Sequence, residues 1–295
     1  MIVQQILNGL VVGGVYALFA LGFTLVFGIH RILNLAHGAV FMSGAFIALY
    51  AVLAGWPLWL GFVLAVLGCG LLSVCIEFAA FRRLRRSGEA EFGAIVSSIG
   101  ANLVIITIAQ KISDTRVLRF PFDTFPIVIF EFWGLRVSAL QLFMSLCAVL
   151  LVLALTGYLY RTQFGRQVRA ASGNERAAKL LGINPGAIYF QTFFLSGALA
   201  GAAGVLVGLA FNSIHFMMGE PWLLAGFVVI ILGGMGSVPG AILGGLLFGM
   251  IRTLSVASPW SGLTDTIVFS LLFVLLLLRP HGLLGKPEAG ALRGR

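Results

Sequence analysis

The sequence predicts an all-α, polytopic membrane bundle, and three observations predict it. Of the 295 residues, 60% are hydrophobic and only 10% are charged, with a mean hydropathy of +1.05, whereas soluble domains contain about 25% charged residues. Apolar stretches of about 20 residues, long enough to cross a bilayer core as helices, recur along the whole chain. The 38 glycines exceed the usual share of about 7%, which suits close helix packing in membranes. We therefore expect a single transmembrane domain over residues 1–295.

Nine apolar segments are expected to be helices, of which eight or nine cross the membrane. The first segment lacks a basic start and a cleavage-like end, so we expect it to remain as a span instead of being removed as a signal peptide. Charged residues, Gly and Pro separate the segments. They are residues 5–29, 35–54, 58–80, 93–110, 138–160, 187–211, 222–236, 239–254 and 264–279.

Polar side chains interrupt the first two apolar segments. Burying such groups in lipid costs free energy unless they find partners, so they should face the bundle interior. They are Asn8, Tyr16, Thr24, Asn34, His37 and Ser43. We expect Asn8, Asn34 and His37 to line a translocation pathway, and hydrogen bonding between helices is the alternative explanation.

Two groups of glycines stand out near the C-terminal end. Residues 233–245, with the sequence GGMGSVPGAILGG, should interrupt a helix. Broken backbone at membrane depth is tolerated only where it is buried in protein or lines a cavity, so this segment is a candidate pathway lining through Gly236, Ser237, Pro239 and Gly240. A tight turn at the cytoplasmic surface is the alternative. The other group is expected to be a packing stripe: Gly197, Gly201, Gly204 and Gly208.

The net charge of +9 could suggest nucleic-acid binding, but the basic residues lie in short loops between apolar segments and are better explained as topology signals. Lys and Arg gather at residues 82–86, 161–179 and 279–295. The positive-inside rule places these three clusters in the cytoplasm. Because successive spans cross the membrane in opposite directions, counting crossings from these clusters puts the N-terminus and residues 111–136 in the periplasm and the C-terminus in the cytoplasm.

The cytoplasmic loop of about residues 161–186 has the pattern of a short surface helix. Asn174 is a good N-cap, Glu175–Leu181 a helical stretch, Gly182 a C-terminal cap and Pro185 a stop. The side chains available to dock into a partner's groove are Ala177, Ala178, Leu180 and Leu181. A helix lying on the bilayer surface is the alternative.

Motifs for catalysis or nucleotide binding are missing from the sequence. It has no GxxxxGK[ST] phosphate loop, no HExxH and no GxSxG. Its three cysteines, Cys69, Cys75 and Cys147, fall in apolar stretches without metal-ligand spacing. We therefore expect no enzyme, no catalytic residue, no metal and no cofactor on this chain. The scarcity of acidic residues at membrane depth also argues against a proton-coupled secondary transporter.

Five strings along the chain carry a resemblance to a known family. They are GLVVGGVYALFALGFTLVFGIHRILNLAHGAVFMSGAF (9–46), IVSSIGANLVI (95–105), TQFGRQVRAASGNERAAKLLGINPGAI (162–188), LGGMGSVPGAILGGLLFG (232–249) and LLLLRPHGLLG (275–285). In this order the sequence resembles the LivH family, the inner-membrane permeases of branched-chain amino acid ABC importers. Two positions depart from the pattern: Ala225, where the family pattern suggests Lys, and Arg252, where it more often has an acid.

The resemblance implies an assembly in the bacterial inner membrane. This chain would pair with a second, LivM-type permease, above two cytoplasmic ABC ATPases that bind the ATP and below a periplasmic solute-binding protein. The segment from Asn174 to Gly182 would be the coupling helix that carries ATPase closure into the membrane. The cargo would be a branched-chain or other hydrophobic amino acid. Importers of urea, short-chain amides or other small solutes resemble the same family, and a secondary transporter is a further alternative.

Overall fold

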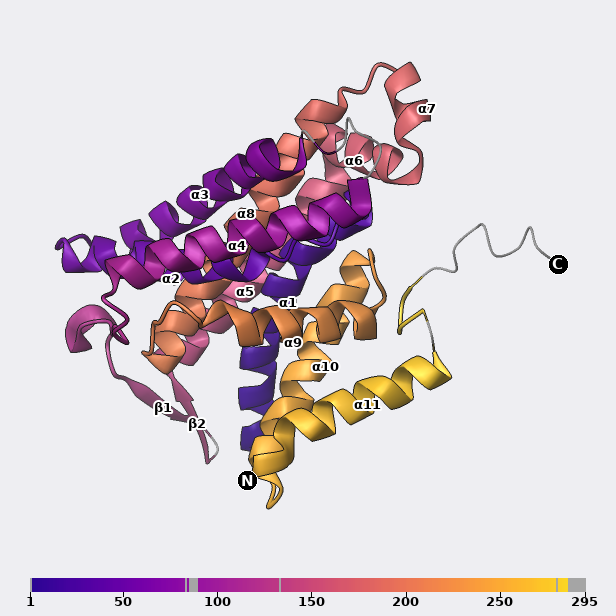
Figure 1. The fold of residues 1–295 in the computed structure, drawn as a ribbon. Coiled ribbons are helices and arrows are strands. Elements are labelled where there is room, and N and C mark those ends of the chain that lie inside the picture. The colour runs from indigo at the N-terminus through magenta and orange to yellow at the C-terminus, as the bar shows by residue number, and fades with distance from the viewer. Residues whose placement is uncertain (1, 83, 85–89, 133, 280, 286–295) are drawn as a thin grey trace.

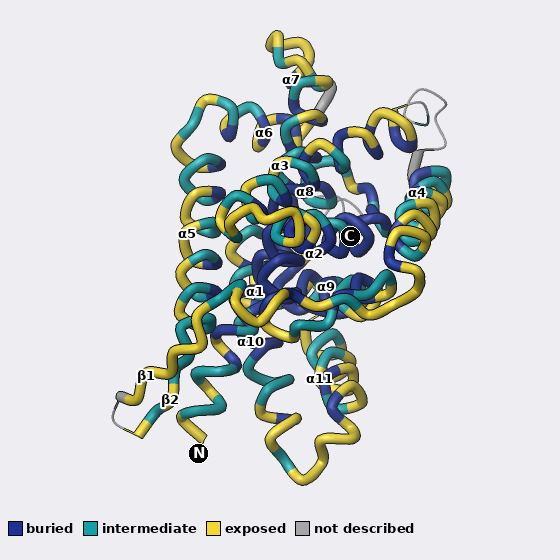
Figure 2. Tube along the Cα trace, turned by 90° about the vertical axis from the view of Figure 1, so that its left-hand side faces the viewer, coloured by how far each residue is buried: buried dark blue, intermediate teal, exposed yellow. Residues whose placement is uncertain are grey.

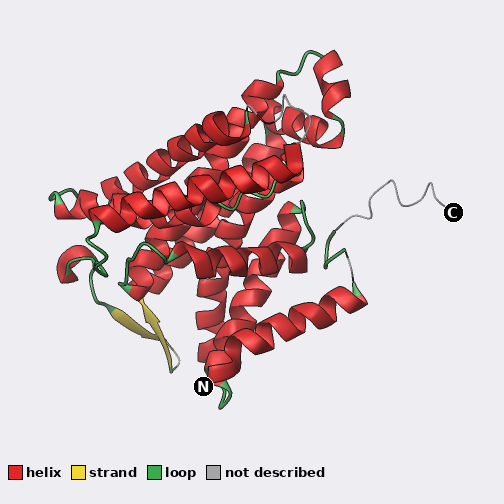
Figure 3. Ribbon diagram, in the orientation of Figure 1, coloured by secondary structure: helices red, strands yellow, loops and turns green. Residues whose placement is uncertain are grey.

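The computed structural model describes residues 2–82, 84, 90–132, 134–279 and 281–285, and these form a helical bundle (Figures 1 and 3). Each of the nine predicted segments is a helix whose ends lie within a few residues of the predicted ones. Within the described residues, seven helices are long and apolar enough to cross a membrane, and α2 and α9 are shorter. The nine are α1 (Ile2–His30), α2 (His37–Leu53), α3 (Leu58–Ile76), α4 (Ala90–Ile112), α5 (Ala139–Arg161), α8 (Pro185–Phe211), α9 (Gly219–Gly233), α10 (Val238–Val256) and α11 (Thr264–Leu278).

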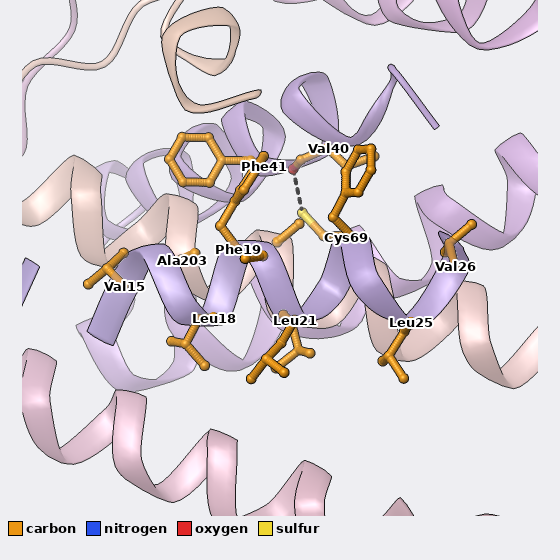
Figure 4. Packing of buried hydrophobic residues seen from close by; sticks show 14 of the residues in the cluster. Val15, Leu18, Phe19, Leu21, Leu25, Val26, Val40, Phe41, Cys69 and Ala203 are labelled. Atoms are coloured by element: carbon orange, nitrogen blue, oxygen red, sulfur yellow. Dashed lines mark hydrogen bonds between the residues drawn. The ribbon is translucent and has the colours of Figure 1, made fainter. Parts of the chain in front are cut away.

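Helices α1 and α8 form the centre of the bundle, and α4, α5 and α11 lie at its periphery (Figure 2). From Val15 to Val26 every residue of α1 is buried, and Figure 4 shows this stretch packed against its neighbours. Cys69 lies in the same core, where its thiol donates to the Val40 carbonyl at 3.3 Å. The peripheral helices expose most of their apolar side chains, as expected for surfaces that face lipid or a partner subunit.

The predicted glycine stripe on α8 is a close-packing surface. A Cβ added at Gly197 would lie 2.5 Å from Ser73 Cβ, and one added at Gly201 would lie 2.6 Å from Cys69 Cβ, both on α3. Gly204 and Gly208 face α2. These contacts leave no room for a side chain, so the small residues permit the close approach of the backbones.

Helices α1–α2–α3 and α8–α9–α10 form two similar units. In each unit a long helix is followed by a shorter one, and a four-residue turn, residues 54–57 or 234–237, leads to the third helix. Helix α8 packs along α3, and α1 packs in the same way along α10, where a Cβ at Gly13 would lie 2.9 Å from Leu246 Cα. The chain therefore contains an internal structural repeat.

The two units are related by a two-fold arrangement. Helices α1 and α8 run antiparallel, because His30 at the end of α1 stacks on Tyr189 near the start of α8. At the starts of α2 and α9, a Cβ on Gly38 would meet the carbonyl of Gly219, and a Cβ on Gly219 would meet that of Gly38. Such a reciprocal contact is what a two-fold axis produces. The repeat is thus of the inverted kind found in many transporters.

An antiparallel hairpin, β1 (Ile129–Phe132) and β2 (Leu135–Ser138), precedes α5 and was not predicted. Its Arg136 exchanges two hydrogen bonds with the Gln4 side chain at 2.8 and 2.9 Å, which fastens the hairpin to the start of α1. The hairpin and the start of α1 lie at one end of the molecule, and the short helix α7 (Glu175–Leu180) lies at the other (Figures 1 and 2). The hairpin and the 161–179 cluster thus lie at opposite ends of the molecule, and their membrane sides stay a prediction.

Several predicted topology signals lie outside the described residues. They are Arg83, Arg85 and Arg86 of the first basic cluster and the tail from Lys286 onward.

Candidate translocation pathway and coupling segment

A hollow with several polar residues in its wall, named here the Gly236 cavity, has a volume of about 760 Å³. It lies between the second half of α1, the end of α5, the α9–α10 turn and α6 (Gln163–Gly173). Three of the predicted pathway residues, Gly236, Ser237 and Pro239, line it. Its other lining residues are Thr24, Leu25, Gly28, Ile29, Leu159, Tyr160, Val168, Arg169, Ser172, Met235, Val238 and Leu284.

The α9–α10 turn that forms one wall of this cavity covers only residues 234–237. The predicted interruption over residues 233–245 is therefore a tight turn between two antiparallel helices, and Gly240 and the glycines after it belong to α10. Gly234 and Gly236 adopt positive φ angles of 102° and 80°, which side chains disfavour. The Ser237 hydroxyl caps α10 by accepting from the Gly240 N–H at 3.2 Å.

A second hollow, named the Asn8 cavity, has a volume of about 260 Å³ and lies at the opposite end of α1. The Asn8 side-chain oxygen accepts hydrogen bonds from Gln4 at 3.2 Å and from Gln141 at 3.1 Å. Trp222, in the first turns of α9, forms another wall. This cavity therefore combines neutral amides with an aromatic and aliphatic lining.

The two cavities lie along the same pair of helices. Helix α1 lines the Asn8 cavity with residues 8–15 and the Gly236 cavity with residues 24–29, and α5 contributes to both. Between them the two helices touch, since a Cβ on Gly14 would lie 3.2 Å from Ala148 Cβ. Each end of this helix pair therefore borders a hollow, and the contact between α1 and α5 separates the two hollows.

Asn34, His37 and Gly240 line neither cavity. The His37 ring packs between Phe19 and Phe23, with its Nε2 3.2 Å from the Phe19 carbonyl oxygen and its Nδ1 3.5 Å from Ser196 Oγ. The Asn34 side chain is 1% exposed, and its oxygen accepts from the Ala36 N–H at 3.2 Å. In this conformation His37 joins α2 to α1 and α8, as the hydrogen-bonding alternative expects. The Asn34 oxygen bonds only within its own turn, and its buried amide nitrogen has no hydrogen-bond partner among the described residues.

The segment between α1 and α2 explains why these two polar residues are buried. Residues 31–36 leave the end of α1 and turn back into the bundle, so that α2 begins beside Phe19 and Phe23. Non-helical backbone at this depth needs partners, and the Leu35 N–H donates to Ser98 Oγ of α4 at 3.2 Å. The sequence pattern predicted a span here but not the inward fold of the connection.

The coupling segment has the predicted local structure. The Asn174 side chain accepts from the Ala177 N–H at 3.0 Å and begins α7. Gly182, with a φ of 82°, ends it in a Schellman motif, in which its N–H donates to Lys179 and that of Ile183 to Ala178. Of the predicted docking residues, Leu180 and Leu181 are 90% and 80% exposed and Ala177 is exposed, whereas Ala178 is buried. The Glu175 side chain lies outside the described part of the chain.

Helix α6 was not predicted, although its sequence contains the signals. The Thr162 side chain caps it by accepting from the Gly165 N–H at 3.1 Å, and Gly165, Val168 and Ala171 form one buried face. Val168, Arg169 and Ser172 reach the wall of the Gly236 cavity. The loop that carries α7 therefore contacts the candidate pathway directly.

Comparison with known proteins decides the family. The family described as the permease component of the branched-chain amino acid transport system matches residues 5–277 of the chain. The chain belongs to this family. Among these permeases, high-affinity branched-chain amino acid transport system permease proteins BraD of Pseudomonas aeruginosa and LivH of Escherichia coli K12 are each 33% identical over 297 residues. These alignments cover 97% of this chain and 96% of each relative.

A differently named permease is also similar. The LivM permease protein of Escherichia coli K12 is 30% identical over 92% of this chain and 68% of its own length. No solved structure shows a significant match to the chain. Among the described residues, no group of three or more His, Cys, Asp or Glu side chains could hold a metal ion.

Proposed function

We propose that this chain is the membrane-spanning permease of an ATP-driven importer that carries branched-chain or other hydrophobic amino acids across the bacterial inner membrane. Family membership and the names of the 33%-identical relatives support the cargo class over urea or short-chain amides. The observation that carries the mechanism is the Gly236 cavity, because the α9–α10 turn and the loop that carries α7 both form part of its wall.

The proposed assembly follows the resemblance. The similarity to both LivH and LivM permeases supports pairing with a second, homologous permease. Two separate ATPases would bind ATP, so this chain needs no cofactor, and a periplasmic binding protein would deliver the solute. The basic residues of α6 and α7 favour a cytoplasmic coupling loop, with the N-terminus in the periplasm and the C-terminus in the cytoplasm.

In the proposed mechanism, α7 transmits ATPase closure to the bundle. The exposed Leu180 and Leu181 would dock into the ATPase, together with Glu175 and Ala177. Asn174 and Gly182 would hold the two ends of the helix, and the buried Ala178 would pack inward instead of docking. Movement of α7 would displace α6 and reshape the Gly236 cavity. The Asn8 cavity would open to the periplasm when the Gly236 cavity closes, and Asn34, His37 and Gly240 would come to line the route only if the bundle rearranges.

The test is ATPase activity and solute uptake by this permease reconstituted with its partner permease, the two ATPases and the binding protein. Leucine, phenylalanine, urea and a short-chain amide are compared. We expect stimulation by the amino acids, and we expect Gly182→Trp to insert normally but to uncouple hydrolysis from uptake, because a bulky residue is strained at a φ of 82°. Undiminished uptake by this variant would contradict the coupling role.

The inverted repeat favours one alternative, a self-sufficient secondary transporter, because such proteins share this architecture. The discriminating measurement is uptake by this chain alone in liposomes under an ion gradient. Flux without ATP or partner subunits would replace the importer hypothesis.

A further inference from the structure

Charge is unevenly distributed in the Gly236 cavity. Among the described lining residues, Arg169 carries the only formal charge, and none is Asp or Glu. One Arg169 N–H donates to the Leu159 carbonyl, and its guanidinium lies 5.2 Å from the centre of the Tyr160 ring. These contacts hold the side chain against α5 and use only part of its five N–H donors. The remaining donors form a positively charged, fork-shaped group suited to a carboxylate.

The N-terminus of α10 adds to the positive potential. The N-cap Ser237 and the first two residues of this 19-residue helix, Val238 and Pro239, border the cavity, and a helix N-terminus carries a partial positive charge. The neighbouring C-terminus of α9 would oppose it, but its Leu232 and Gly233 carbonyls accept hydrogen bonds from the backbone N–H groups of Leu283 and Leu284 at 2.9 and 3.0 Å.

A second polar group in the cavity wall is Thr24. It lines the cavity from α1 and is 2% exposed, yet its hydroxyl has no hydrogen-bond partner among the described residues. A threonine inside a helix commonly satisfies its hydroxyl with the carbonyl four residues earlier. An unpaired buried hydroxyl is costly. Its oxygen is itself buried, so rotation of the Thr24 side chain toward the cavity would be needed for a polar atom there to pair with it.

Most of the remaining wall is apolar, although Ser172 and Tyr160 also line it. The apolar lining includes Leu25, Ile29, Val168, Met235 and Leu284. The volume of about 760 Å³ falls within the range typical of small-molecule sites. One cation and hydroxyl groups combined with aliphatic walls suit a molecule that has a carboxylate at one end and a branched hydrocarbon at the other.

We propose that the Gly236 cavity is a binding site for an apolar amino acid, in which Arg169 holds the substrate carboxylate and Thr24 supplies a hydroxyl contact. This inference rests on the proposed function and deepens it. Because no described lining residue is acidic, the site recognises the carboxylate and the hydrocarbon and makes no ion pair with the ammonium group. It should therefore accept 4-methylpentanoate, which lacks the amine of leucine, and reject leucinol, which lacks the carboxylate.

The experiment uses the complete permease–ATPase complex in nanodiscs without binding protein, and saturation-transfer difference NMR with leucine, 4-methylpentanoate or leucinol at millimolar concentration. We expect the first two to bind and leucinol to bind at least about tenfold more weakly, since a charge-assisted hydrogen bond is lost. Arg169→Gln should weaken leucine binding to a similar degree, Arg169→Lys less, and Thr24→Val by a smaller factor.

The matched control is Arg166→Gln, on the same helix but on a separate surface hollow with Gln163 and Gln167. It should bind leucine like the unmodified complex. Equal binding of leucine and leucinol, or unchanged leucine binding by Arg169→Gln, would overturn the site. ATP-driven leucine uptake measured in parallel separates the two hypotheses, because uptake by the unmodified complex supports the function even if the site fails.

Discussion

The two hairpin turns of the inverted repeat have the same length but different surroundings. In the first, residues 54–57, Gly55 has a φ of 86°, and a Cβ added there would meet nothing within 4 Å. In the second, residues 234–237, a Cβ on Gly234 would lie 2.6 Å from Gly285 Cα and 3.0 Å from the His281 carbonyl oxygen. Both turns reverse the chain between antiparallel helices, and each borders a hollow. The hollow beside the first turn, which Ala54 and Trp56 help to line, is almost wholly apolar, whereas the second turn is packed and borders a hollow with charged and hydroxyl side chains in its wall. The two units share their arrangement of helices, but their turns differ in packing, and the candidate site lies beside the packed turn.

The largest effect should come from adding a methyl group to the packed turn. Gly234→Ala combines the strain of a left-handed backbone with overlap against backbone atoms that cannot rotate away, so we expect a loss of more than about 4 kcal/mol of stability. Gly55→Ala bears only the conformational strain, about 1–2 kcal/mol. Thermal unfolding of both detergent-purified variants by circular dichroism checks this difference. Equal losses would mean that the two turns are equivalent after all.

The two long helix contacts of the repeat, called here the α8–α3 seam and the α1–α10 seam, should lose similar stability when a glycine in them is enlarged. A Cβ on Gly197 of the α8–α3 seam would lie 2.5 Å from Ser73 Cβ, and one on Gly249 of the α1–α10 seam would lie 2.7 Å from the Gly9 carbonyl oxygen. We expect Gly197→Val and Gly249→Val each to destabilise by about 1–3 kcal/mol through overpacking.

The control for the seams is Gly100→Ala on the peripheral helix α4. No atom lies within 4 Å of a Cβ at that position, so helix propensity alone predicts a gain of up to about 1 kcal/mol. The same thermal unfolding measurement applies. A large loss in only one seam variant would contradict the structural equivalence of the two units.

The sequence predicted the helices well because their signals are local. Apolar runs of span length, the Asn174 cap and the Gly182 stop each act within a few residues, and the structure has helices at all of these places. The glycine stripe on α8 was also predictable, because helical spacing places its members on one face.

The site was only partly predictable, because cavities depend on contacts between distant segments. Gly236, Ser237 and Pro239 were found through their helix-breaking chemistry, but Arg169 was seen only as one charge in a basic cluster. Its place beside the α9–α10 turn follows from the packing of α6 on α1 and α5. Likewise, the burial of His37 depends on residues 31–36 turning inward, and no local pattern encodes that path.

His37 offers a smaller test of the repeat. It precedes Gly38 as Met218 precedes Gly219, and these two glycines meet at the two-fold axis. His37→Met therefore places the residue of one unit at the equivalent position of the other. We expect a loss of about 1–2 kcal/mol, because the hydrogen bonds to Phe19 and Ser196 disappear. ATP-driven uptake should be retained.

Uptake by His37→Met is measured in the reconstituted complex, alongside its unfolding temperature. If the variant is stable but transports nothing, the pathway role that the sequence suggested for His37 applies in another conformation of the bundle.

The smallest effect on stability should come from α7, which precedes only the second unit of the repeat. Leu181 is 80% exposed, so Leu181→Ser should change stability by no more than about 0.5 kcal/mol. If this leucine docks into an ATPase, the same change removes apolar contact area from the interface and should lower solute-stimulated ATP hydrolysis. Gln163→Ala, at an exposed position of the same loop, is the control and should leave hydrolysis unchanged. If Leu181→Ser keeps full solute stimulation of ATP hydrolysis, then α7 is not the contact through which the ATPases move the second unit, despite its exposed leucines.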